Sequence, residues 1–388
     1  MNSSKPKLFR ISTVPMSLNL LLKGQLRFLN EHFEVTAISG AGDDLEMVAK
    51  REGVKVHPIV MHRPISLYQD IKSLWQLYLY FKKEKPDIIH SITPKAGLLS
   101  MVAGKLAGVP VRIHTFTGLI FPNQEGYIKH TLIMMDKILC KCATKIIPEG
   151  EGVKKDLLKH KITNKPLEII ANGNVNGIDL DYFSSENVSA IERQKMREHL
   201  EMSQDDFVFV FIGRIGHEKG INELVEVFGM LQKEGAKNCK LLLVGPLEKN
   251  NQLTQENILK IFNHPDIIFV GYQTEVRSYL AMSNALVFPS YREGFPNVVL
   301  EALAMQLPAI VTDINGCNEI VTDNQNGMLI PVKDIESLYI SMKKLYSDPV
   351  FYSLLKENTR QSVVDKFCRY KVWESVLHVY QLSQKNMN

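Results

Sequence analysis

The sequence predicts an α/β protein in which two doubly wound parallel-sheet domains follow one another along the chain. Three observations support this prediction. The 388 residues exceed what one hydrophobic core usually serves, so two domains are expected. Short runs rich in Ile and Val alternate with helix-length segments, which is typical of a parallel sheet covered on both faces. The alternation restarts after residues 172–179, where turn-forming Asn, Gly and Asp residues gather.

Seven short apolar runs in the first half are predicted strands. They are Leu8–Ser12, Val35–Ser39, Val54–Val60, Asp87–Ser91, Val111–Thr115, Lys145–Ile147 and Glu168–Ile170. The segment 65–83 carries apolar side chains at helical spacing. We expect this helix to bury its apolar stripe against the sheet, and we weigh a place on a membrane surface as the alternative. The stripe consists of Leu67, Ile71, Leu74, Trp75, Tyr78 and Leu79.

Five further strands are predicted in the second half: Phe207–Ile212, Lys240–Val244, Ile267–Val270, Ala285–Phe288 and Ala309–Thr312. After Asp365 an amphipathic pattern predicts a C-terminal helix that must bury an aromatic face. Its apolar positions are Phe367, Tyr370, Trp373, Val376, Leu377 and Tyr380. The predicted organisation is therefore a first domain at 1–175, a second at 176–365 and a helix at 366–388.

Composition excludes several classes of protein. No run approaches the roughly 18 apolar residues of a membrane span, and the start lacks a signal-peptide core, so we expect a cytoplasmic protein. Five cysteines without a CxxC pair fit neither a disulfide framework nor a zinc site. No nucleic-acid partner is expected.

Charge is distributed unevenly between the two halves. Residues 1–180 hold 25 Lys and Arg against 16 Asp and Glu, which leaves 21 against 26 in the remainder. The first half therefore has a net charge of +9 and the second of −5. A basic half suggests contact with an anionic membrane surface or a phosphorylated acceptor, and scattered surface lysines are an equally weighted alternative.

A glycine-containing basic loop follows the predicted strand at 207–212. Gly213-Arg214 and Lys219-Gly220 lie between that strand and a helix whose N-terminus favours anions. Arg can hold a phosphate with two parallel hydrogen bonds, while Lys supplies a mobile point charge. This pattern suits a diphosphate, although basic residues in a glycine loop are common.

A second loop, with two glutamates, precedes another predicted helix. Glu293 lies in the loop ahead of Pro296, which is suited to the first helical turn. Glu301 lies on an otherwise apolar helix, where a carboxylate needs hydrogen-bond donors such as sugar hydroxyls. The alternative is that Glu301 points to solvent and that Glu293 is a turn residue.

Together these loops resemble those of the family-4 retaining glycosyltransferases. The Gly213-Arg214 to Lys219-Gly220 segment resembles the family's phosphate loop, and Glu293 to Glu301 resembles its paired-glutamate motif. Further matches are Asn176-Gly177-Ile178-Asp179 at the domain junction, the strand end at Gly245, and Gly271-Tyr272. The resemblance implies the GT-B fold, in which two Rossmann-like domains face a central cleft and a C-terminal helix crosses back to the first domain.

The resemblance also implies roles for individual residues. Arg214 and Lys219 would neutralise the leaving nucleoside diphosphate, Glu293 would face the donor sugar, and Glu301 would contact the ribose. The donor-binding set is completed by Gly213, Gly245, Tyr272, Gly294, Phe295, Asn297 and Val298. We assign Glu293 to donor positioning and electrostatic support and not to a nucleophilic role. The expected donor is a UDP-sugar.

The first half resembles bacterial members that build capsular or O-antigen units on a polyprenyl diphosphate carrier. Segments that begin at His90 and Val109 carry the resemblance, with Lys95 and His114 among their polar residues. Many relatives have a histidine where this chain has Thr117. Three alternatives are open: Thr117 takes over the role of that histidine, His114 does so, or neither residue does. A Gly-Gly pair usual after the first strand is absent here.

We expect neither a metal ion nor a cofactor. Asp179-Leu180-Asp181 matches the D-x-D pattern of metal-dependent glycosyltransferases, but the hinge motif accounts for it. The Arg-Lys pair already supplies positive charge for the diphosphate. The main alternative function is a nucleotide-sugar epimerase of the same fold. A silent binding module is disfavoured because Arg214, Lys219, Glu293 and Glu301 are all present.

Overall fold

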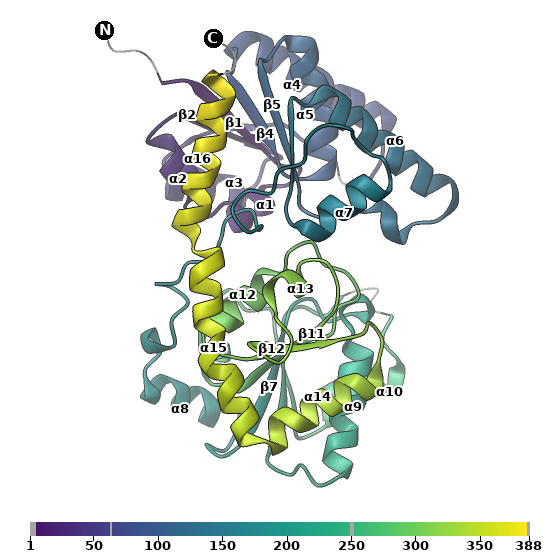
Figure 1. The fold of residues 1–388 in the computed structure, drawn as a ribbon, viewed down its shortest axis with the longest axis vertical. Coiled ribbons are helices and arrows are strands. Elements are labelled where there is room, and N and C mark those ends of the chain that lie inside the picture. The colour runs from purple at the N-terminus through teal and green to yellow at the C-terminus, as the bar shows by residue number, and fades with distance from the viewer. Residues whose placement is uncertain (1–4, 63, 249–251, 386–388) are drawn as a thin grey trace. The chain divides into compact units, whose positions relative to one another are not determined.

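The computed structural model describes residues 5–62, 64–248 and 252–385. It divides the chain into two compact units (Figure 1). Unit 1 contains the chain up to Gly177 together with the segment from Arg369 onward, and unit 2 contains Ile178–Cys368. The predicted boundaries were residues 176 and 366.

Unit 1 is a six-stranded parallel sheet with strand order β3-β2-β1-β4-β5-β6. The strands are β1 (Lys7–Ile11), β2 (Glu34–Ser39), β3 (Lys55–Pro58), β4 (Ile88–Ser91), β5 (Val111–Phe116) and β6 (Lys145–Pro148). One face packs against α1 (Pro15–Leu21), α2 (Gln25–Asn30), α3 (Asp43–Glu52) and α16 (Arg369–Lys385). The other packs against α4 (Leu67–Glu84), α5 (Pro94–Ala107), α6 (Gly126–Cys142) and α7 (Glu151–Lys159).

Unit 2 repeats the architecture with strand order β12-β11-β10-β7-β8-β9. Its strands are β7 (Phe207–Ile212), β8 (Cys239–Val244), β9 (Ile267–Gly271), β10 (Ala285–Phe288), β11 (Ala309–Thr312) and β12 (Gly327–Ile330). The helices are α8 (Ala190–His199), η3 (His217–Lys219), α9 (Ile221–Lys233), α10 (Gln255–Asn263), α11 (Arg277–Ala281), α12 (Asn297–Ala304), α13 (Cys317–Ile320), α14 (Ile335–Ser347) and α15 (Pro349–Phe367). The central strand β7 is buried on both faces, which explains its continuous apolar sequence.

Two strand predictions were wrong. The run Glu168–Ile170 forms no strand, because the chain turns immediately afterwards at Ala171 (φ +51°) and Gly173 (φ +93°). Only an isolated bridge joins Leu167 to Ile146. The second error is an omission, because β12 is a four-residue strand that begins on a glycine and has little periodicity to detect.

The prediction that α4 faces the core is confirmed, but its apolar stripe is buried only in part. Leu67, Ile71, Trp75 and Leu79 are between 50 and 79% exposed. The buried face of α4 is formed instead by Ser73, Leu77 and Phe81, with Leu74 and Tyr78 partly covered. Both faces of this helix are apolar, so the pattern alone could not say which one meets the sheet. Even so, no helix in the described chain has the length and apolarity to span a bilayer.

The C-terminal helix begins three residues later than predicted, at Arg369. Cys368 has an extended backbone (φ −55°, ψ 127°) that separates α15 from α16. Phe367 therefore belongs to the core of unit 2, where its ring lies 5.5 Å from that of Phe295. Trp373 and Tyr380 are buried in unit 1, whereas Tyr370 is 55% exposed. The aromatic face is thus divided between the two units.

Candidate active site

Three adjacent strands of unit 2 end in glycines at the carboxyl edge of the sheet. Gly213 follows β7, Gly245 follows β8 and Gly271 closes β9. A Cβ on Gly245 would lie 1.8 Å from the Gly213 carbonyl oxygen, and the φ of Gly245 is +143°. The amide of Gly245 donates to the Gly271 carbonyl (2.8 Å). Only glycine permits this close backbone packing, which aligns the three loops that follow.

Arg214 lies on the first of these loops and is exposed. Its guanidinium forms an ion pair with Glu248 on the loop after β8. The two loops are joined by backbone hydrogen bonds from Ile215 to Pro246 (2.9 Å) and from Glu248 to Ile215 (3.0 Å). Arg214 is therefore held by a neighbour while its side chain remains 60% exposed and accessible to an anionic ligand.

Lys219 and Glu293 come together from different loops and form an ion pair. Their side chains are only 14% and 15% exposed, so water screens the pair weakly. Gly220 makes this approach possible, because a Cβ there would lie 2.2 Å from the Pro289 carbonyl oxygen. The structure thus places two of the predicted catalytic residues in one cluster.

Ser290 is a member of this cluster that the sequence analysis missed. Its hydroxyl donates to Glu293 Oε1 at 2.6 Å, and the residue is completely buried. Two donors, Ser290 and Lys219, therefore hold the same carboxylate oxygen. The only sequence signal was a serine two residues after β10, in a loop where parallel sheets present polar groups to ligands. Glu248, the partner of Arg214, was also missed, because its position in the loop after β8 gives no stronger signal.

The paired-glutamate segment leads into α12. Pro296 precedes the first turn, and no side-chain hydrogen bond caps the helix, whose N-terminal end attracts negative charge. Phe295 is 8% exposed and packs in the core, so only its backbone can face a ligand. Gly294 lies against the loop after β11, where a Cβ on Gly316 would lie 2.2 Å from the Gly294 carbonyl oxygen. Asn297, Val298 and Glu301 are partly exposed on this helix.

Two other predicted features belong to unit 2. Tyr272, just after β9, is 67% exposed. The D-x-D residue Asp179 accepts a hydrogen bond from the Tyr182 amide (3.0 Å), which gives it a structural role in a turn. Cys317, at the start of α13, has a raised pKa because it is buried and lies near Glu293. Its thiol therefore stays protonated.

The predicted acceptor residues of unit 1 differ in accessibility. His114 is 1% exposed, with Nδ1 at 2.8 Å from Ser91 Oγ, and burial lowers its pKa to about 3. Thr117 is partly exposed and donates to the Ile92 carbonyl at 2.9 Å. Lys95 pairs with Asp70 at 2.7 Å. Of the two candidates for the missing histidine, Thr117 has the more accessible side chain.

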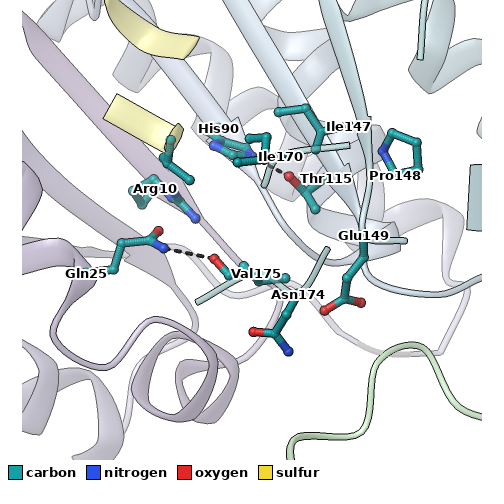
Figure 2. Close-up of a pocket in the computed structure, with 11 residues that line it drawn as sticks. Arg10, Gln25, His90, Thr115, Ile147, Pro148, Glu149, Ile170, Asn174 and Val175 are labelled. Carbon is teal, nitrogen blue, oxygen red and sulfur yellow. Dashed lines mark hydrogen bonds between the residues drawn. The ribbon is translucent and has the colours of Figure 1, made fainter. Parts of the chain in front are cut away.

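A buried polar cluster joins α16 to the sheet of unit 1 (Figure 2). Tyr380 Oη lies 2.6 Å from both Arg10 Nη1 and His90 Nδ1, and His90 Nε2 lies 2.8 Å from Thr115 Oγ1. Arg10 can only donate a hydrogen bond to Tyr380 Oη, so we assign the Tyr380 hydroxyl as the donor to His90 Nδ1. The neutral imidazole then carries its proton on Nε2, which donates to Thr115 Oγ1. Burial and the nearby Arg10 keep the pKa of His90 well below its usual value. The cavity beside these groups is about 20 Å³.

The two parallel doubly wound sheets and the basic loops at a carboxyl edge define a GT-B glycosyltransferase. The fold matches that of a glycosyltransferase from Rickettsia africae (TM-score 0.81, 20% identity, 99% of this chain and 100% of that one). It also matches Anabaena Alr3699/HepE in complex with UDP and glucose (TM-score 0.83, 16% identity, 97% and 99% covered).

Sequence comparisons identify the family. Residues 192–362 match the model of glycosyl transferases group 1, and residues 25–181 match that of glycosyltransferase family 4. The capsular polysaccharide biosynthesis glycosyltransferase CapM of Staphylococcus aureus is 32% identical over 376 residues, which cover 96% of each chain. An Escherichia coli UDP-Gal:alpha-D-GlcNAc-diphosphoundecaprenol alpha-1,3-galactosyltransferase is 28% identical, with 97% of each chain covered. The chain belongs to this family of glycosyltransferases.

Proposed function

We propose that the protein transfers a sugar, with retention of anomeric configuration, from a UDP-sugar to a polyprenyl-diphosphate-linked saccharide during surface polysaccharide synthesis. The observation that carries the proposal is the cluster of Lys219, Glu293 and Ser290, together with Arg214 on the same loop as Lys219, at the sheet edge of unit 2. The name of the E. coli relative supports the class of donor and acceptor, and that of the S. aureus relative supports a place in polysaccharide biosynthesis. No metal or cofactor enters the proposal.

The chemistry follows from the charges at this edge. As the bond between the anomeric carbon and the phosphate oxygen breaks, the nucleoside diphosphate leaves with the electron pair. Arg214, Lys219 and the N-terminal end of α12 stabilise the negative charge that develops. Each cation is paired with a carboxylate, Glu248 or Glu293, so the diphosphate competes for it.

Retention in this proposal needs no enzyme nucleophile. The acceptor oxygen bonds to the anomeric carbon on the face that the phosphate leaves, and its proton passes to a departing phosphate oxygen. Glu293 Oε1 is engaged by Lys219 and Ser290, which reduces its nucleophilicity and favours a role in orienting the sugar.

The surface of unit 1 supports a lipid-linked acceptor at the cytoplasmic face of a membrane. Leu67, Ile71, Trp75 and Leu79 form an exposed apolar stripe on α4. The exposed charged side chains on this helix are lysines, at positions 72, 82 and 83. An apolar stripe with lysines nearby suits the interface of an anionic bilayer.

The test is turnover of UDP-sugars with and without a polyprenyl-diphosphate-linked saccharide, with the product anomer assigned by NMR. Transfer that requires the acceptor and keeps the donor's α configuration is expected. Conversion of the UDP-sugar alone into a second UDP-sugar would establish the epimerase alternative, and an inverted product would refute retention.

A further inference from the structure

Helices α5 and α6, strand β5, the segment before α4 and the loop after β5 line an apolar cavity in unit 1. Helices α4, α5 and α6 cover the same face of the sheet (Figure 1). The cavity measures about 80 Å³. Its apolar lining includes Ile65, Leu98, Phe116, Leu119, Leu132 and Met135. Lys95 and Asp136 are the charged residues of this lining. None of these positions other than Lys95 belongs to the predicted transfer site.

The cavity is continuous with the exposed apolar surface of unit 1. Ile65 and Ile120 line it and are also 57% and 44% exposed, so they mark its opening. The helices α4 and α6 also carry exposed apolar side chains: Leu67, Tyr68, Ile71, Tyr127, Ile128 and Met134. Apolar surface gathered in this way marks a site of interaction with an apolar partner.

The two charged lining residues are compatible with an apolar ligand. Lys95 is neutralised by Asp70, and its ammonium also donates to the Pro64 carbonyl. Burial raises the pKa of Asp136 to about 7, so a large share of its carboxyl groups is uncharged near neutral pH. The cavity therefore carries little net charge.

We propose that this cavity binds the hydrocarbon chain of a lipid, with a methyl branch or chain end inside it and the remaining chain along the exposed surface of α4. At about 80 Å³ it is smaller than the roughly 150 Å³ cavity that accommodates benzene, so it admits a branch and not a ring. The proposal rests on the proposed function, because a lipid-linked acceptor would bring such a chain to unit 1.

Two sources can supply the hydrocarbon: an isoprenoid diphosphate or an acyl chain of a membrane phospholipid. Calorimetric titration with farnesyl diphosphate probes the first, and monomeric dihexanoyl phosphatidylglycerol probes the second. Inorganic diphosphate serves as the control for binding through charge alone. UDP binding is measured on every sample, so that failure of the donor site is distinguished from failure of this cavity.

Met135→Trp fills the cavity, and Leu106→Trp is the control, because Leu106 lies on α5 outside the cavity lining and is 61% exposed. Farnesyl diphosphate affinity should fall roughly tenfold or more in the first variant and stay unchanged in the second. Leu132→Trp provides a second blocking variant if Met135→Trp fails to fold. The same pattern with the phospholipid alone would assign the cavity to bilayer acyl chains.

Equal binding by wild type and both folded blocking variants would overturn the proposal. So would binding of inorganic diphosphate as tight as that of farnesyl diphosphate, or no binding of either lipid. If the wild-type protein does not bind UDP, the proposed function is refuted independently of the cavity.

Discussion

Lys219 and Glu293 meet on facing loops of unit 2, so removal of the ammonium group leaves a mostly buried carboxylate next to the expected diphosphate. We expect Lys219→Ala and Arg214→Ala each to lower turnover about a hundredfold, or on the order of 3 kcal/mol in barrier. Steady-state kinetics would measure this loss, with exposed Lys237→Ala as the control. Turnover near wild type in both variants would refute the site assignment.

The buried histidine of β5 predicts a pH dependence of stability. His114 has a pKa of about 3 in the folded protein against 6.5 for the ordinary group, so the unfolded chain binds more protons between these values. The contribution of His114 to the free energy of unfolding should be fully present above pH 6.5 and should be lost as the pH falls toward 3. Urea unfolding at pH 7 and pH 5 would measure the decrease, and His114→Gln should make it shallower. An identical pH dependence in this variant would contradict the assignment.

The sequence predicted that Arg214, Lys219 and Glu293 act at loops that follow strands, because the residue types and the strand-loop-helix order are local features. It did not reveal Ser290 or Glu248. The hydrogen bond of Ser290 to Glu293 depends on how their shared loop folds, and Glu248 reaches Arg214 from a loop 34 residues further along the chain. His114 and Thr117 could not be ranked either. Their difference is one of burial, which the sheet determines.

At the scale of elements, α4 offers a matched comparison between its two apolar faces. Leu77 is completely buried and Leu79 is 50% exposed. We expect Leu77→Ala to lower the free energy of unfolding by about 2–5 kcal/mol and Leu79→Ala by less than about 1 kcal/mol. Equilibrium urea unfolding would measure both values. Equal destabilisation would mean that the exposed face is covered.

The exposed stripe of α4 also makes a prediction about membranes. Wild-type protein should float with anionic liposomes at low salt and less so at high salt, because screening weakens the lysine contribution. Leu67→Glu should reduce flotation, whereas Leu259→Glu, an exposed leucine of α10, should leave it unchanged. Failure of the wild-type protein to float at low salt would favour a soluble acceptor.

Most strands were predicted because parallel strands buried on both faces are continuous apolar runs. The exposure of most of the α4 stripe and the omission of β12 show the limits of this reasoning. A helix with two apolar faces has no preferred side in sequence alone, and a four-residue strand beginning with glycine has no measurable period.

At the scale of the molecule, α16 is required by unit 1 although it follows unit 2 in the sequence. Trp373 Nε1 donates to Asn176 Oδ1 (2.7 Å), and Tyr380 binds Arg10 and His90 in the core. Truncation after Cys368 should therefore unfold unit 1, while the fragment 178–368, which keeps its whole core, should fold and bind UDP. Circular dichroism and calorimetry of both proteins would test this. A truncated chain with full activity would contradict it.

The place of α16 also determines the order in which the units can fold on the ribosome. Unit 1 begins to emerge first, yet it lacks its helix until residues 369–385 have been translated. Unit 2 is complete at Cys368 and can fold earlier. At about 5–20 residues per second, the first 177 residues wait roughly 10–40 s for their last helix. During that interval the surface that later receives Trp373 and Tyr380 is open to chaperones, and a messenger RNA truncated near residue 368 yields an orphaned first unit beside an intact second one.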